Sequence, residues 1–176
     1  AIRSRGLGDV YKRQILGSLV IVFFYILFRF QKWQFSLGAV SAVFHDVLIV
    51  LGIFSLTYKI MPFNMEINQA FIAALLTVIG YSLNDTVVVF DRIREFFRIH
   101  SSWDSETTVN TALNSTLSRT LNTSLTTLIV LLAIFIFGGE SIRGFMFALI
   151  IGVMVGTYSS VFIATPIMFD SYKNKN

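Results

Sequence analysis

The sequence predicts an all-α polytopic membrane protein whose chain crosses the bilayer five times. Hydrophobic residues make up 55% of the 176 residues, charged residues make up 14%, and the mean hydropathy is +0.71, a balance typical of membrane proteins. A helix of about 20 apolar residues spans the hydrocarbon core of a bilayer. The chain offers five such runs, at Ile15–Phe30, Phe35–Tyr58, Ile67–Phe90, Leu117–Phe137 and Ile142–Phe169.

Residues 1–14 lie outside this pattern, and we expect them to be foreign to the protein. The segment Ser4–Gln14 reads without a mismatch as a translated transposase adapter of the kind used to prepare sequencing libraries. The alternative is a signal peptide with Ile15–Phe28 as its apolar region, although no small-residue cleavage site follows. Residues 1–14 hold four basic side chains and one acidic one, so without them the formal net charge falls from +4 to +1. The basic balance therefore predicts no nucleic-acid partner.

The membrane domain is expected to cover residues 15–170. Its first span is short, as expected if the foreign junction cuts into it. The third span should continue as a helix from Asp91 to Ile99, into a long loop at residues 91–116. Either Asp104 or Ser105 can cap the helix that leads into the fourth span.

The fourth span must carry a charge into the membrane. Its purely apolar part, Leu128 to Phe137, is too short to cross the hydrocarbon core. The helix must therefore begin near Leu117, which places Arg119 inside the bilayer.

Basic residues are distributed unequally between the two ends of the spans. One end receives Arg29, Lys32, Arg92, Arg94, Arg98, Lys173 and Lys175, and the other receives only Lys59 and Arg143. The positive-inside rule makes the first end cytoplasmic, together with the loop at residues 91–116 and the tail at residues 171–176. With five spans, Ile15 then starts outside. We therefore expect the natural protein to be longer at its N-terminus.

Asp85 and Arg119 are the charged residues expected to act together within the membrane. Asp85 lies seven residues before Arg92, a depth of about 10 Å, and Arg119 has a comparable depth on the next, antiparallel helix. A charge in the bilayer costs about 2.5–3.5 kcal/mol on insertion scales, which marks it as functional by default. If the two pair, protonation of Asp85 would release Arg119 and couple a proton to helix movement. A static ion pair that only specifies packing is the alternative.

Polar residues near this pair are candidates for supporting roles in a wet site. They recur at helical spacing on the third and fourth spans, at Tyr81, Ser82, Asn84, Ser118, Asn122 and Thr123. The alternative for each Ser and Thr is a hydrogen bond to its own helix backbone. His45 and Asp46 lie near the middle of the second span and could either relay protons or form a satisfied structural pair.

The last span carries small residues at every fourth position, a pattern that favours close helix packing. They are Gly144, Ala148, Gly152, Gly156, Ser160 and Ala164. Pro166 follows and is expected to kink or unwind the helix. No constellation for a metal, a cofactor, a nucleophile or a phosphate loop is found, and the chain has no cysteine.

Four motifs in order along the chain resemble those of the SecF family, including the SecF half of fused SecDF. They are Ala42–Val47, the signature Gly80–Glu95, Leu117–Ser124 and Gly156–Ser160. The resemblance runs from about Ile15 to Phe169. It implies part of a helical bundle of the resistance-nodulation-division superfamily, with Asp85 and Arg119 in a proton pathway that also uses an acid from SecD. No enzymatic activity is implied.

The resemblance implies an accessory subunit of the Sec protein-export machinery in the bacterial inner membrane, driven by the proton-motive force. Its implied partners are SecD, separate or fused, the Sec translocon, the exported unfolded polypeptide, protons and membrane lipid. The chain lacks the first SecF span, the periplasmic domain and SecD, so we expect a fragment that does not transport protons alone. A structural scaffold without proton conduction and an exporter of drugs or lipids are the alternatives.

Overall fold

The fold is a bundle of long helices in a computed structural model, which describes the backbone of residues 2–173 and the side chains of residues 13–173. Its elements are α1 (Ile2–Phe30), α2 (Trp33–Thr57), α3 (Gln69–Ile99), α4 (Ser105–Phe137), α5 (Glu140–Ser159), a π-helical turn at Ser160–Ala164, and α6 (Thr165–Lys173). Five segments in the described part are long and apolar enough to cross a membrane. The predicted all-α, five-span fold is confirmed.

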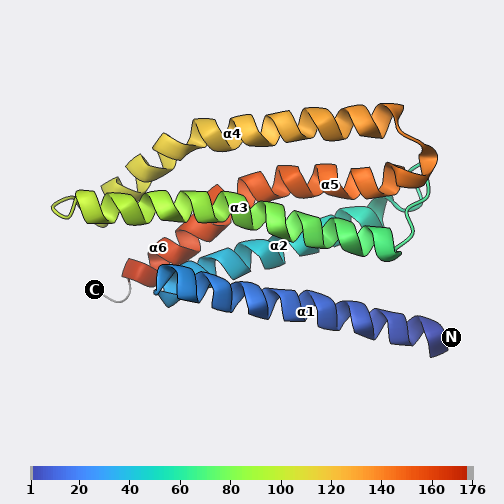
Figure 1. Cartoon of the computed structure of the whole chain (residues 1–176), viewed down its shortest axis with the longest axis horizontal. Helices are drawn as coiled ribbons and strands as arrows, with labels where there is room; N and C mark the ends of the chain where they lie inside the picture. The colour runs from blue at the N-terminus through green and yellow to red at the C-terminus, as the bar shows by residue number, and fades with distance from the viewer. Residues whose placement is uncertain (1, 174–176) are drawn as a thin grey trace.

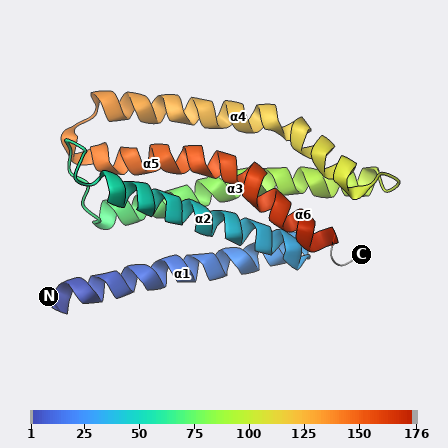
Figure 2. The same cartoon turned by 180° about the vertical axis from the view of Figure 1, so that it is seen from behind.

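The helices run side by side along one long axis, with α1 and α4 at the two outer edges (Figures 1 and 2). Helix α1 packs on α2, and α4 packs on both α3 and α5. The α2, α3 and α5 helices pack on one another and form the centre. Large apolar side chains such as Phe28, Leu56 and Phe137 are 78%, 78% and 88% exposed. In a membrane protein this outer surface faces lipid, which is as apolar as the side chains.

Side-chain caps fix where two of the helices begin. The Asn68 side chain accepts a hydrogen bond from the backbone N–H of Phe71 at the start of α3, at 3.1 Å. The Asp104 side chain accepts from the backbone N–H of Thr107 at the start of α4, at 2.9 Å. Of the two predicted candidates, Asp104 is therefore the N-cap. The hydrogen bond from the Thr107 backbone N–H lowers the pKa of the Asp104 carboxyl below its ordinary value.

The connection between α3 and α4 is short, because both helices continue through most of residues 91–116. Helix α3 continues to Ile99 and α4 begins at Ser105, so only residues 100–104 are outside a helix. Both membrane helices thus extend beyond their apolar runs, as predicted for Asp91–Ile99 and for the helix capped at Asp104 or Ser105.

Small residues let α5 approach α3 closely. All six of the residues picked out by the four-residue spacing are buried. The Cα of Gly152 lies directly against the Val78 side chain, and Gly156 lies against Ser82. Farther along, Gly144 lies against the backbone carbonyl of Asn64. A Cβ atom would clash with Val78 at Gly152 and with the Asn64 carbonyl at Gly144, and it would crowd Ser82 at Gly156.

The π-helical turn lies immediately before Pro166, where the sequence predicts a kink. Proline has no backbone N–H and its ring clashes with the carbonyl four residues earlier, so a regular α-helix cannot continue through it. In a π-helical turn each carbonyl accepts from the N–H five residues later instead of four, which widens the helix. The Thr165 hydroxyl also donates to the Ser160 carbonyl, at 3.0 Å.

We predict that Gly152→Ala destabilises the bundle, because its new methyl group meets the β-branched Val78 side chain. Overpacking of this kind costs about 1–3 kcal/mol in free energy of unfolding. Gly52→Ala is the matched control, since nothing lies within 4 Å of its Cβ position. Unfolding of the purified protein by a denaturing detergent, followed by circular dichroism, measures both. Equal stability of the two variants would contradict the packing described here.

Candidate functional site

Asp85 is a buried carboxylate on α3 with an incomplete set of hydrogen bonds. Asp85 is 3% exposed, and its Oδ2 atom has no hydrogen-bond partner within the described part of the chain. Asp85 lies on α3, which packs against α4, the helix that carries Ser124 and Arg119. An incompletely satisfied acid in a membrane helix is costly and marks a functional position.

The predicted ion pair between Asp85 and Arg119 is not formed. Among the described residues, Arg119 makes no ion pair within 4.0 Å and its side chain is exposed. It lines a cavity of about 370 Å³ between α3 and α4, together with Arg92 and Glu95. A long cationic side chain can extend from its backbone position toward the polar end of the membrane. The prediction placed the two residues by backbone depth alone and missed this freedom.

A ladder of hydroxyl groups crosses from α3 through α4 to α5. The Tyr81 hydroxyl donates to Ser124 Oγ at 3.2 Å, and Ser124 Oγ lies 2.6 Å from Thr157 Oγ1. Tyr81 precedes Asp85 by four residues on α3, so this ladder lies about one helical turn from that acid. The sequence singled out Tyr81 but neither Ser124 nor Thr157. Ser124 lies five residues after Arg119, outside the spacing that was used to define the polar face.

Asp46 is the centre of a second, fully buried network. Its carboxylate Oδ2 accepts hydrogen bonds from Ser82 Oγ on α3 at 2.5 Å and from Ser159 Oγ on α5 at 2.7 Å. The His45 Nδ1 atom lies 3.1 Å from the other carboxylate oxygen. Asp46 on α2 is 0% exposed, whereas the His45 side chain is 32% exposed. One acid therefore joins the three central helices.

The two networks meet on α3. Ser82 binds Asp46, and Asp85 follows it by three residues, almost one helical turn later. Gly156 of α5 lies against Ser82, which brings Ser159 within reach of the same carboxylate. Sequence reasoning did not single out Ser159, although it lies within the quoted motif Gly156–Ser160.

Four of the predicted supporting residues lie outside these networks. Their side chains are on exposed helix surfaces, at Asn84, Ser118, Asn122 and Thr123. The Thr123 hydroxyl donates to the Arg119 backbone carbonyl four residues earlier, at 3.0 Å. This is the bond to the helix backbone that the alternative interpretation anticipated.

The chain is similar to known membrane proteins of protein export. A family model described as protein export membrane protein SecD/SecF, C-terminal, matches residues 9–174. The chain is 58% identical to the protein translocase subunit SecF of Rhodothermus marinus over 163 residues, which cover 93% of this chain and 52% of that protein. It is 45% identical to the SecF subunit of Haemophilus influenzae, covering 93% and 47%.

Two solved structures share the fold. A crystal structure of SecDF in a super-membrane-facing form matches with a TM-score of 0.81 at 42% identity, covering 92% of this chain and 21% of that one. SecDF of Thermus thermophilus, described as a translocon-associated membrane protein, matches with a TM-score of 0.81 at 41% identity, covering 93% and 22%. The chain thus spans about half the length of the curated relatives that it matches.

We predict that Asp46→Ala weakens the packing of α2 against α3 and α5. The substitution leaves the Ser82 and Ser159 hydroxyls without their acceptor, which costs about 1–3 kcal/mol in free energy of unfolding. Asp46→Asn keeps one acceptor oxygen and should lose less. Asn84→Ala on the exposed surface of α3 is the control. Detergent unfolding curves compare the three variants, and an Asp46→Ala variant as stable as Asn84→Ala would refute the role of the network.

Proposed function

The chain belongs to the family of SecD/SecF protein-export membrane proteins, and from this premise we propose that it is the membrane part of a proton-driven export subunit. In this role the complete protein couples the proton-motive force to the movement of unfolded polypeptides across the bacterial inner membrane. Its partners are SecD, fused or separate, and the Sec translocon. The role is transport, with no covalent chemistry on a substrate.

The observation that carries this proposal is the unsatisfied carboxylate oxygen of Asp85. A group that only specified packing would have all its hydrogen bonds made, as Asp46 does. Asp85 instead retains an open position next to the hydroxyl ladder of Tyr81, Ser124 and Thr157. A proton that reaches Asp85 along polar side chains or water would neutralise it there.

Arg119 supplies the second part of the mechanism. Among the described residues it makes no ion pair with Asp85, and its side chain lines the cavity between α3 and α4. Deprotonated Asp85 attracts the guanidinium, and protonated Asp85 does not. Each protonation therefore changes the force between α3 and α4, and this change can be transmitted to helix positions. The separation of the two side chains argues against the static ion pair.

The proposed orientation follows from the charges at the helix ends. Arg29, Arg94 and Arg98 lie where α1 and α3 end, at the same end of the bundle as the C-terminus of α6 (Figure 1). Lys59 and Arg143 lie at the opposite end, by the connections after α2 and α4. The positive-inside rule makes the first end cytoplasmic. Residues 1–14 remain proposed as foreign sequence.

A scaffold that holds SecD or the translocon without conducting protons is the second candidate. It is favoured by the Asp46 network, which joins three helices without an evident path for protons. The two candidates differ in what they require of Asp85, because only the proton-driven subunit needs that carboxylate to bind and release a proton.

We predict that Asp85→Asn in the complete, SecD-containing protein abolishes proton flux and proton-driven export, because the amide cannot take up a proton. The measurements are pH-sensitive dye fluorescence in proteoliposomes and export of a secreted protein. Asp91→Asn is the matched control, since Asp91 is a half-exposed carboxylate on the same helix, paired with Arg29. Normal assembly with unchanged flux and export in Asp85→Asn would establish the scaffold instead.

A further inference from the structure

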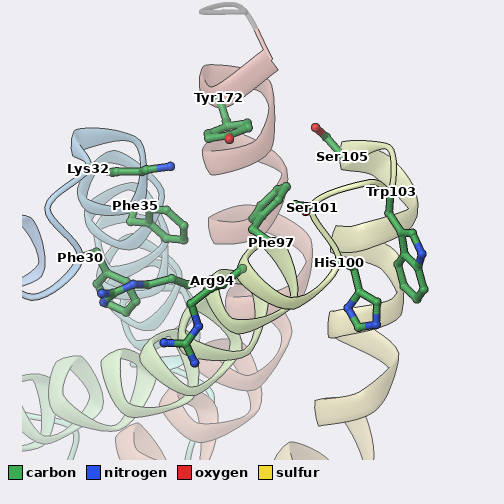
Figure 3. Close-up of a pocket in the computed structure, with 11 residues that line it drawn as sticks. Phe30, Lys32, Phe35, Arg94, Phe97, His100, Ser101, Trp103, Ser105 and Tyr172 are labelled. Atoms are coloured by element: carbon green, nitrogen blue, oxygen red, sulfur yellow. The ribbon is translucent and has the colours of Figure 1, made fainter.

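A cavity of about 430 Å³ opens at the proposed cytoplasmic end of the bundle, away from Asp85 and Arg119. It lies where α1 ends, α2 begins and α3 turns toward α4, and it also reaches the last turn of α6. Three basic side chains contribute to its lining, from Lys32, Arg94 and Arg98. Figure 3 shows Lys32 and Phe35 on one side, Trp103 on the other, and Phe97 and Tyr172 between them.

The basic side chains of the cavity have no acidic partner within the described part of the chain. Among residues 13–173, none of the three forms an ion pair within 4.0 Å. The side chain of Arg94 donates to the backbone carbonyl of Arg29, at 3.3 Å. The side chains that line the cavity include no carboxylate. The cavity therefore carries an excess of positive charge.

The acids nearby are engaged with other groups. Asp91 binds Arg29 at 2.9 Å, and Glu95 binds Arg92 at 2.7 Å. Asp104 accepts the Thr107 N–H as the cap of α4. These contacts leave the positive charge of the cavity for an anion from outside the chain.

The aromatic lining suits the polar boundary of a membrane. Lys32 Nζ lies 4.9 Å from the centre of the Tyr172 ring, which itself stacks on Phe97 with ring centres 5.1 Å apart. His100 stacks on Trp103 at 3.9 Å. Tyr and Trp side chains are enriched where lipid headgroups meet the hydrocarbon. The cavity thus combines cations and amphipathic rings at the ends of membrane helices.

From this combination we propose that the cavity binds the phosphate-bearing headgroup of an anionic phospholipid of the cytoplasmic leaflet. Basic pockets between membrane helices on this side bind such headgroups, and anionic lipids concentrate there. Lys32 and Arg98 have exposed side chains and can reach a phosphate without disturbing the packing. A soluble phosphate has the same charge chemistry, but the position at the helix ends favours the lipid.

Trp103 provides a direct readout, because the chain has only two tryptophans. In a Trp33→Phe variant, the remaining tryptophan fluorescence comes from Trp103, which lines the cavity. The protein is reconstituted into phosphatidylcholine vesicles that contain an equal fraction of either brominated phosphatidylglycerol or brominated phosphatidylcholine. We expect stronger quenching of Trp103 by the anionic lipid. Equal quenching by the two lipids would overturn the proposal.

Variants of single basic residues test whether the preference for the anionic lipid arises at the cavity. Lys32→Gln and Arg98→Gln should each lower the relative affinity for phosphatidylglycerol about fivefold, and Lys32→Arg should restore it. Lys59→Gln, at the other end of the bundle, should leave it unchanged. Loss of the preference in Lys59→Gln as well would show a general charge effect and refute the site. Displacement of the lipid by inorganic phosphate, beyond that caused by chloride at equal ionic strength, would refute the lipid as occupant.

Discussion

The fold depends on the need of one buried carboxylate for hydrogen-bond donors where no bulk water is available. Asp46 meets this need only because α3 and α5 bring Ser82 and Ser159 to the same oxygen. That meeting in turn requires the close approach of α5 to α3 at Gly152 and Gly156. The glycines and the acid therefore form one constraint: the small residues set the distance between the backbones, and the carboxylate fixes their register.

The two membrane acids illustrate different uses of a costly group. Asp46 is fully enclosed and its Oδ2 atom is paired with two hydroxyls, which suits a fixed anchor. Asp85 lies almost one turn farther along the same interface of α3 and keeps one oxygen unpaired. Because Ser82 is held in place by Asp46, the backbone that carries Asp85 is held as well. Arg119, by contrast, has an exposed side chain on the outer helix α4.

The sequence predicted what depends on local pattern and left open what depends on three-dimensional contact. The apolar runs identified the five spans, and the capping residue Asp104 identified where α4 begins. Both features follow from the sequence of a single helix. The prediction of an ion pair between Asp85 and Arg119 was wrong, since helical depth does not determine where a long side chain extends. Ser124, Thr157 and Ser159 were missed because a single Ser or Thr in a membrane helix usually bonds to its own backbone. Only the neighbouring helices reveal their second role.

The π-helical turn at Ser160–Ala164 changes which neighbour the small residues serve. The extra residue of such a turn offsets every later side chain by about 100° around the helix axis. Before the turn, Gly152 and Gly156 face α3; at its end, the Ala164 carbonyl lies against Gly38 of α2, and α6 packs on α2 after it. A single stripe of small residues is thus divided between two partners. The last span, from α5 through the turn to α6, therefore connects the middle of α3 to the start of α2.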